Sequence, residues 1–508
     1  MHRRSRGNRS KARRSMVRAL ADSITSYDAL SLAEAIRTRA LSSEQVITAY
    51  LDRIESFNGR VNALVTVDQE RALRSAREAD AELREGRIRG PLHGVPVTIK
   101  DALLTAGLRT TAGHPKYAEL VPDADAWVVD KLKRAGVIVI GKTNCSTLCS
   151  DIQTRNEIFG VTNNPWSVGR TAGGSSGGEA AAVALGMSPL GIGSDTAGSI
   201  RIPSSYCGVF GLKTSIGKIP RDGHVPLHDE THARPDSLTV IGPIARSIRD
   251  LTLCYEVLTG ESTTKGAPPA PPRIFWTQDF TTQVIDDEVT RALDETFSVL
   301  TRRGADVRKV APPFPLEKLF STYMRLYMFE CAPEDISRAL LPLFFVSEAI
   351  RSPFRGGARG SYERLKGKQS VLKRTMDEFL RACDCWVLPA TPSTAFVHQK
   401  TGRGIQVTSR GRMKKHSYWE ASMGLTYPFN LLGNPSVVIP LARGKEGMPI
   451  GVQVVGRLGE DRKLLSVAEH VARMIGADCS DHPARLGSLL ERPPRTESTL
   501  QVTSIWNG

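Results

Sequence analysis

Between residues 173 and 203 the chain reads Gly173-Gly-Ser-Ser-Gly-Gly-Glu179 and then, after an alanine-rich stretch, Gly193-Ser-Asp-Thr-Ala-Gly-Ser-Ile-Arg-Ile-Pro203. Such small residues let a substrate approach the backbone, so the amide groups of these loops can stabilise the oxygen of a reacting carbonyl. We therefore predict that the second loop forms an oxyanion hole from the amides of Thr196, Ala197, Gly198 and Ser199.

A lysine ends an apolar segment upstream of these loops. Lys100 closes the run Gly94-Val-Pro-Val-Thr-Ile-Lys-Asp101, so it is either desolvated or reaches outward to solvent. Desolvation disfavours the charged ammonium form. A neutral amine within hydrogen-bond reach of a serine can accept the hydroxyl proton, as in the Ser–Lys variants of the hydrolytic triad.

Two shorter motifs formally match other enzyme classes. Residues 136–143 (GVIVIGKT) have the spacing of a P-loop, but their β-branched run favours a buried strand over a phosphate cradle. Residues 174–178 (GSSGG) match the nucleophile elbow of α/β-hydrolases with Ser176 as nucleophile. That elbow needs an apolar strand before it, and residues 166–172 predict a poor strand. It also needs a later histidine, for which the candidates are His228, His232, His398 and His416.

Taken together, the two loops resemble the amidase signature family, with Thr98-Ile-Lys-Asp101 upstream and Gly141-Lys-Thr-Asn144 between them. The resemblance covers about residues 28–475. It implies an α/β fold in which a central mixed, twisted β-sheet is surrounded by α-helices.

The resemblance also assigns roles to individual residues. It places the family's catalytic serine on Ser199, its cis-peptide bridging serine on Ser175 and its lysine on Lys100. Three further matches, at Ser176, Asp195 and Arg201, fall on positions that brace the catalytic loops in the family. One departure is Ala197, which stands where many relatives have glycine and adds one methyl group to the oxyanion loop.

The function that the resemblance implies is hydrolysis of a carboxamide C–N bond. Ser199 would attack the carbonyl while its proton passes through Ser175 to Lys100, and water would release the acid from the acyl-enzyme. This mechanism needs no metal and no organic cofactor. Two alternatives stay open: an acyltransferase that passes the acyl group to an amine, and a glutaminase-like subunit of an amidotransferase complex.

The predicted substrate is a small-molecule amide. Residues 321–346 concentrate aromatic and methionine side chains, which favours either core packing or a pocket for an apolar or aryl acyl group. A homodimer would fit the family. We expect no nucleic-acid partner, because the first 18 residues hold eight of the 68 Lys and Arg residues and no acid, which is just over half of the net charge of +15.

The remaining composition is that of an ordinary globular protein. No run of 18 apolar residues that could span a bilayer occurs. Eight cysteines without CxxC pairs indicate free thiols rather than a zinc site. We expect a soluble cytoplasmic protein, for which the basic arm could also serve as an organellar targeting segment.

The predicted organisation has three parts. Residues 1–27 form a disordered basic arm, residues 28–475 a single catalytic domain, and residues 476–508 a flexible tail. The domain divides into core motifs at 91–260, a substrate-pocket and variable region at 274–420, and a C-terminal hairpin and helix at 425–475. Residues 351–374 and 401–415 are basic and weakly patterned, which favours solvated loops. Capping boxes are predicted at Ser31 with Glu34 and at Ser42 with Gln45.

Overall fold

The computed structural model describes residues 22–224, 236–262, 271–280, 284–331 and 357–477. Most of the predicted arm and tail lie outside these residues, as do His228 and His232. Within the predicted bounds of the arm, residues 22–26 are helical and Ile24 is buried. Packed structure therefore begins within the last residues of the segment that we predicted as an arm.

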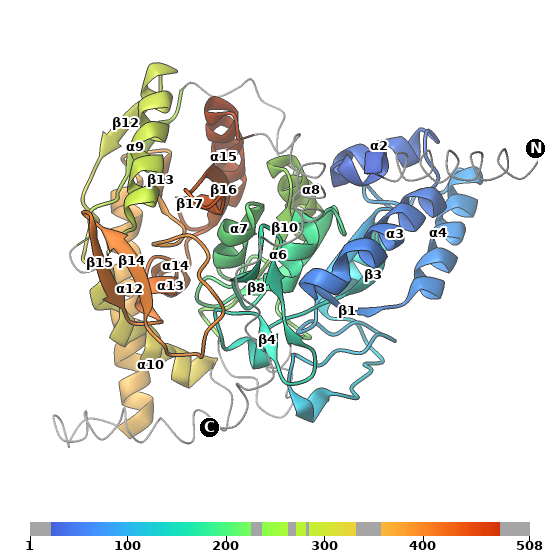
Figure 1. Cartoon of the computed structure of the whole chain (residues 1–508), viewed down its shortest axis with the longest axis horizontal. Helices are drawn as coiled ribbons and strands as arrows, with labels where there is room; N and C mark the ends of the chain where they lie inside the picture. The colour runs from blue at the N-terminus through green and yellow to red at the C-terminus, as the bar shows by residue number, and fades with distance from the viewer. Residues whose placement is uncertain (1–21, 225–235, 263–270, 281–283, 332–356, 478–508) are drawn as a thin grey trace, which may run out of the picture.

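Eleven strands form one mixed sheet through the middle of the molecule (Figure 1). Across the sheet they are β1 (Leu64–Val67), β3 (Ile138–Thr143), β2 (Pro96–Lys100), β8 (Leu190–Asp195), β10 (Val240–Ala245), β9 (Phe210–Lys213), β16 (Ser436–Arg443), β17 (Pro449–Val455), β13 (Cys385–Pro389), β11 (Arg273–Trp276) and β12 (Asp306–Lys309). Strand β2 is parallel to β3 and β8, whereas β10 is antiparallel to β8. The predicted mixed sheet is confirmed. It combines strands from the first half of the chain, up to β10, with strands from the second half, from β11 onward.

Helices pack around this sheet. Figure 1 places α2, α3 and α4 near β1 and places α9, α12 and α15 toward the opposite end, with α6, α7 and α8 between them. Their bounds are α2 (Ala29–Arg37), α3 (Ser43–Val61), α4 (Gln69–Arg84), α5 (Trp127–Arg134), α6 (Gly177–Ala184), α7 (Arg201–Cys207), α8 (Ile248–Thr259), α9 (Asp287–Arg302), α10 (Phe320–Glu330), α12 (Gly357–Leu380), α13 (Glu420–Met423), α14 (Tyr427–Leu432) and α15 (Asp461–Ile475). None of the helices among the described residues is long and apolar enough to cross a membrane.

Local signals in the sequence set several of these boundaries. Helix α3 begins with the predicted capping box, in which Ser42 and Gln45 each accept from the other's backbone amide. The box predicted at Ser31 is wrong, because Asp28 is the N-cap of α2 and accepts from the Ser31 amide. The C-terminal hairpin and helix are confirmed as β16, β17 and α15.

Two segments that we predicted as solvated loops are regular structure. Residues 351–374 overlap α12, whose many basic residues hide the apolar positions Leu365, Met376 and Leu380 that are buried. Residues 401–415 contain the hairpin β14 (Ile405–Ser409) and β15 (Arg412–His416). Buried and exposed residues alternate along β14, as in a half-covered strand. Where the structure describes them, the basic residues that suggested loops in both segments lie at exposed or partly buried positions of these elements.

Candidate active site

Lys100 lies at the carboxyl end of β2, where its side chain is completely buried. Its Nζ is 2.6 Å from Ser175 Oγ and 2.9 Å from Ser194 Oγ. Lys100 and Ser194 meet because β2 and β8 are parallel neighbours, so their carboxyl ends reach the same edge of the sheet. Of the two orientations that the sequence left open, Lys100 takes the desolvated one.

The loop that carries Ser175 is fixed by neighbouring residues. The peptide bond between Gly174 and Ser175 is cis, as the resemblance implied. The Thr154 hydroxyl donates to the Gly173 carbonyl at 2.9 Å and accepts from the Gly177 amide at 2.9 Å. A Cβ on Gly177 would collide with the Thr154 side chain. The glycines therefore let Thr154 sit directly against the backbone of the loop.

Ser176 does not have the exposure that a nucleophile elbow requires. Its buried hydroxyl lies 3.3 Å from the Ser194 carbonyl and so ties this loop to β8. The segment before the loop does contain a strand, β7 (Ser167–Thr171), which differs from our expectation. That strand belongs to a small two-stranded sheet with β6 (Asn163–Asn164) and not to the central sheet.

The loop that carries Ser199 has all of its carbonyl groups hydrogen-bonded within the protein. The acceptors and donors are Asp195 O with Asn430 Nδ2 (2.9 Å), Thr196 O with the Tyr323 hydroxyl (3.1 Å), Ala197 O with the Thr426 hydroxyl (2.6 Å), Gly198 O with the Ile202 amide (2.7 Å) and Ser199 O with the Ser176 amide (3.2 Å). In a trans peptide the C=O and the following N–H point in opposite directions. The N–H groups of this loop therefore point away from the donors that bond to its carbonyl oxygens.

Three of the four predicted oxyanion-hole amides are free. In the part of the chain that the structure describes, the amides of Thr196, Ala197 and Ser199 have no hydrogen-bond partner. The Gly198 amide instead donates to Asp195 Oδ1 at 2.8 Å, so our expectation for this fourth amide is wrong. Gly198 is needed for shape, because its φ is +125° and a Cβ would collide with Thr426.

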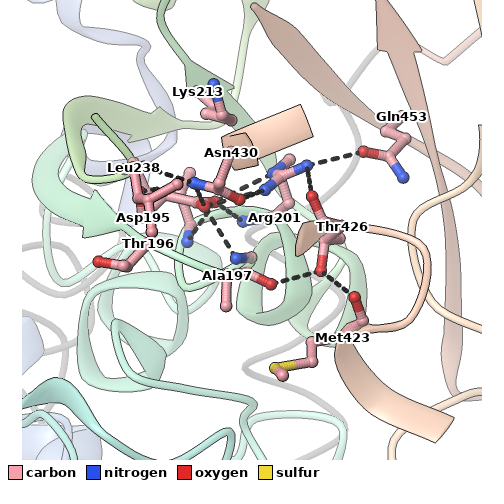
Figure 2. Close-up of polar contacts among 12 residues, drawn as sticks. Asp195, Thr196, Ala197, Arg201, Lys213, Leu238, Met423, Thr426, Asn430 and Gln453 are labelled. Atoms are coloured by element: carbon pink, nitrogen blue, oxygen red, sulfur yellow. Dashed lines mark hydrogen bonds and ion pairs between the residues drawn. The ribbon is translucent and has the colours of Figure 1, made fainter. Parts of the chain in front are cut away.

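A buried ion pair between Asp195 and Arg201 lies against this loop (Figure 2). Arg201 Nη2 lies 2.9 Å from Asp195 Oδ1, and neither side chain is exposed. Burial alone would raise the pKa of the Asp195 carboxyl, but Arg201 holds that pKa well below its usual range. Beyond Asp195, the guanidinium donates to the Thr426 carbonyl (2.9 Å), Gln453 Oε1 (3.0 Å) and Asn430 Oδ1 (2.5 Å). The bracing role that the resemblance implied for Asp195 and Arg201 agrees with this geometry.

Several residues around the site were missed by the sequence reasoning. They are Ser194, which contacts Lys100, and four residues that hold the Ser199 loop: Tyr323, Thr426, Asn430 and Gln453. Gln453 lies in the segment 447–456, which also resembles the family, so that resemblance could have identified Gln453. Nothing in the local sequence marks Thr426 or Asn430 as neighbours of residues more than 200 positions earlier.

The second contact of the predicted relay is not made by a direct hydrogen bond. Within the described residues the Ser199 hydroxyl has no hydrogen-bond partner. Ser199 is half-buried, and its carbonyl accepts from the Ser176 amide in the neighbouring loop. Catalytic hydrogen bonds of free enzymes often shorten only when substrate binds. The Ser175–Ser199 step therefore stays a prediction.

Lys142, the lysine of the formal P-loop match, is buried within β3. Its Nζ donates to the Leu103 carbonyl and to the hydroxyls of Thr105 (2.9 Å) and Thr110 (2.8 Å). Burial lowers its pKa to about 8, opposed by the nearby Asp101 carboxylate. A lysine that is enclosed in this way cannot reach a phosphate, which argues against a P-loop. The strand that we predicted from the β-branched run is confirmed as β3.

One cluster of potential metal ligands occurs among the described residues. Oxygen and sulfur atoms of Asp236, Glu330 and Cys331 lie within 4.8 Å of one another. Arg221 pairs with Asp236 at 3.6 Å and Lys366 pairs with Glu330 at 3.4 Å. These cations already balance the two carboxylates, and burial holds the pKa of the Cys331 thiol well above its usual range. The cluster is therefore explained as part of the packing.

The fold and this arrangement of serine, lysine and oxyanion loop define an amide-cleaving class of enzyme, and the chain belongs to the amidase family, whose profile matches residues 45–465. It is 30% identical to a glutamyl-tRNA(Gln) amidotransferase subunit of Cutibacterium acnes, over 88% of this chain and 95% of that protein. A crystal structure of an amidase is 32% identical, with a TM-score of 0.76 over 89% of this chain and all of that one. The solved glutamyl-tRNA(Gln) amidotransferase subunit of Thermotoga maritima is 27% identical, with a TM-score of 0.65 over 85% of this chain and 91% of that one.

Proposed function

We propose that the chain cleaves a carboxamide C–N bond through an acyl-enzyme on Ser199. The observation that carries this proposal is the Ser199 loop, in which the carbonyls of residues 195–199 are all occupied while three amides have no partner within the described part of the chain. Such preorganised donors stabilise the negative oxygen of a tetrahedral intermediate without rearranging during the reaction. Thr196, Ala197 and Ser199 supply these donors.

In the proposed mechanism the buried lysine accepts and returns the proton. In the proposed first step Ser199 Oγ bonds to the amide carbon while its proton moves through Ser175 to the amine of Lys100, 2.6 Å from Ser175 Oγ. The same path returns the proton to the departing nitrogen, because an amide anion is a poor leaving group. Water, activated by the relay, then releases the acid and restores Ser199.

The acyl group would lie beside an aromatic wall. Tyr323 holds the Thr196 carbonyl and stacks on Tyr327 with their centroids 6.1 Å apart. Ala197 packs against the same buried apolar cluster, which includes Phe429 and Trp386. These neighbours support an apolar or aryl acyl group over a charged one.

A substrate panel tests the proposal. Purified protein is incubated with aliphatic, aryl and long-chain amides, and release of amine or ammonia is measured. We expect turnover that falls to the background rate in Ser199→Ala and persists in Ser188→Ala, a buried serine whose hydroxyl donates to the Leu190 carbonyl. Undiminished turnover in Ser199→Ala would contradict the proposal.

A second candidate is a glutaminase-like subunit of an amidotransferase complex. The curated relatives support it more directly than they support a free amidase, since the first of them, 29–31% identical to this chain, are glutamyl-tRNA(Gln) amidotransferase subunits. Ammonia release by the chain alone, from L-glutamine and from simple amides, separates the candidates. Turnover of simple amides favours the free enzyme, whereas a reactive Ser199 without amide turnover favours the subunit.

An acyltransferase would share every residue of this site. Its distinguishing property is that the acyl-enzyme reacts with an amine faster than with water, which depends on exclusion of water from the pocket. Turnover reactions supplied with hydroxylamine report this partition directly, because a transferase forms mainly the hydroxamate and a hydrolase mainly the acid.

A further inference from the structure

A buried histidine is linked to Lys100 through Ser194, and the sequence analysis did not single it out. His224 is 3% exposed, and its Nε2 is 2.9 Å from Ser194 Oγ. The same Ser194 oxygen is 2.9 Å from Lys100 Nζ. His224, Ser194 and Lys100 therefore form a chain of three polar groups that leads to the proposed proton acceptor.

The backbone holds His224 firmly in this position. It forms an isolated β-bridge with Leu103, three residues after Lys100, and its amide donates to the Arg221 carbonyl at 3.0 Å. The preceding Gly223 has a φ of +81°, and a Cβ there would lie 2.5 Å from Ala126 Cα. The imidazole is thus tied to the segment that directly follows the lysine.

The direction of the Ser194 hydroxyl hydrogen decides whether the lone pair of Lys100 is available to Ser175. A neutral amine has one lone pair, and that lone pair must face Ser175 if Lys100 is to take its proton. The Ser194 hydroxyl has a single hydrogen. If this hydrogen points at Lys100 Nζ it occupies the lone pair, and if it points at His224 it leaves the lone pair free.

We propose that His224 is a positioning residue whose Nε2 accepts the Ser194 hydroxyl hydrogen, so that Ser194 can only accept from Lys100 and the lone pair of Lys100 stays directed at Ser175. The role requires the tautomer of imidazole that carries its hydrogen on Nδ1, a buried nitrogen that has no hydrogen-bond partner among the described residues. It rests on the proposed function, because it concerns the delivery of the Ser199 proton.

A reagent that reports serine reactivity without knowledge of the substrate tests this role. A fluorophosphonate reacts when Ser199 Oγ bonds to phosphorus, fluoride leaves and the serine proton passes into the relay. Intact-mass measurement gives the second-order labelling rate. Thermal unfolding of each variant checks that it is folded.

The decisive comparison uses the side chain and its partner together. We expect His224→Phe to slow labelling about 10- to 100-fold, in the range of general-base effects, and His224→Gln, whose amide oxygen can accept the hydrogen, to stay within about threefold of the parent. In a Ser194→Ala background, His224→Phe should change the rate less than about threefold, because no hydroxyl is left to compete for Lys100. His93→Phe is the matched control, since His93 is 5% exposed and bonds to the Ala79 carbonyl; it should label at the parental rate.

Each contrary result has a separate meaning. Parental labelling in His224→Phe, equal slowing by His224→Gln, or the same slowing in the Ser194→Ala background would overturn the positioning role. If His224→Phe does not fold, His224→Leu takes its place in the same comparison. Labelling of Ser199→Ala at the parental rate would instead refute the proposed function itself.

Discussion

The two serine loops of the site are held in place by different parts of the chain. The Ser175 loop depends on Thr154, about twenty residues earlier, and on Lys100. The Ser199 loop depends on Thr426, Asn430 and Gln453, which lie more than 220 residues later. The contacts of the first loop thus come from the N-terminal part of the chain, whereas the second loop also depends on contacts from the C-terminal part of the sheet and from α14.

The largest expected effect concerns the chemistry of the Ser175 loop. Lys100→Met should lower the labelling rate of Ser199 by about three orders of magnitude or more, because a methionine cannot accept the proton from Ser175. Lys142→Met removes an equally buried lysine whose partners are Thr105, Thr110 and a backbone carbonyl. It should destabilise the protein but slow labelling less than about tenfold. Similar labelling rates in the two variants would contradict the role of Lys100.

This difference between the loops explains what the sequence could predict of the site. Lys100, Ser175 and Ser199 lie in motifs whose composition is visible locally, and the parallel pairing of β2 with β8 brings Lys100 to Ser194, a few residues before Ser199. The residues that support the Ser199 loop could not be predicted in the same way. Thr426 acts through its hydroxyl on the carbonyl of Ala197, a contact that depends on a long-range packing arrangement.

The next effect tests whether the Ser199 loop needs its distant support. Arg201→Met should lower the free energy of unfolding by about 3–5 kcal/mol, because it leaves the buried carboxylate of Asp195 without its charge partner. Chemical denaturation measures this change. Arg134→Met removes an exposed arginine paired with Asp130 and should cost less than about 1 kcal/mol. Equal losses in the two variants would show that the buried pair does not support the fold.

The fold shows the same division between local and distant information. The sequence predicted α3, α15 and the β16–β17 hairpin, because caps, periodicity and turns are local. It failed at α12 and at β14–β15, where basic residues on the exposed faces obscured the buried positions. In those segments the neighbours that cover one face decide the structure, and they come from elsewhere in the chain.

A third prediction uses the protonation of Lys213, which lies beside the Arg201 network (Figure 2). Burial, reinforced by the charge of Arg201, lowers the pKa of Lys213 from 10.5 to about 7. Between those two pH values the unfolded chain binds a proton that the folded chain does not, so this group makes the free energy of unfolding rise with pH. The rise is at most about 1.4 kcal/mol per pH unit.

Comparison with Lys213→Met isolates this contribution. Unfolding is measured at several pH values from 7 to 10 for both proteins, and the difference between the two curves removes the titration of other groups. We expect the parent protein to gain stability relative to Lys213→Met as the pH rises. A constant difference would show that Lys213 keeps its proton in the folded protein, stabilised by the carbonyls of Thr214 and Asn434 to which it donates.

The smallest effect distinguishes holding the loop from holding the fold. Thr426→Val keeps the shape of the side chain but removes the hydroxyl that donates to the Ala197 carbonyl at 2.6 Å. The loss of one buried hydrogen bond should cost about 1–2 kcal/mol of unfolding free energy. The same bond sets the peptide plane that follows Ala197, so the oxyanion-hole amides on either side should become less ordered and the labelling rate of Ser199 should fall several-fold. Thr48→Val removes an exposed hydroxyl bonded to a helical carbonyl and should change neither quantity. A Thr426→Val protein that lost stability but kept the parental labelling rate would show that the Ser199 loop keeps its reactive shape without this distant contact, and the contrast between the two loops would then be one of folding alone.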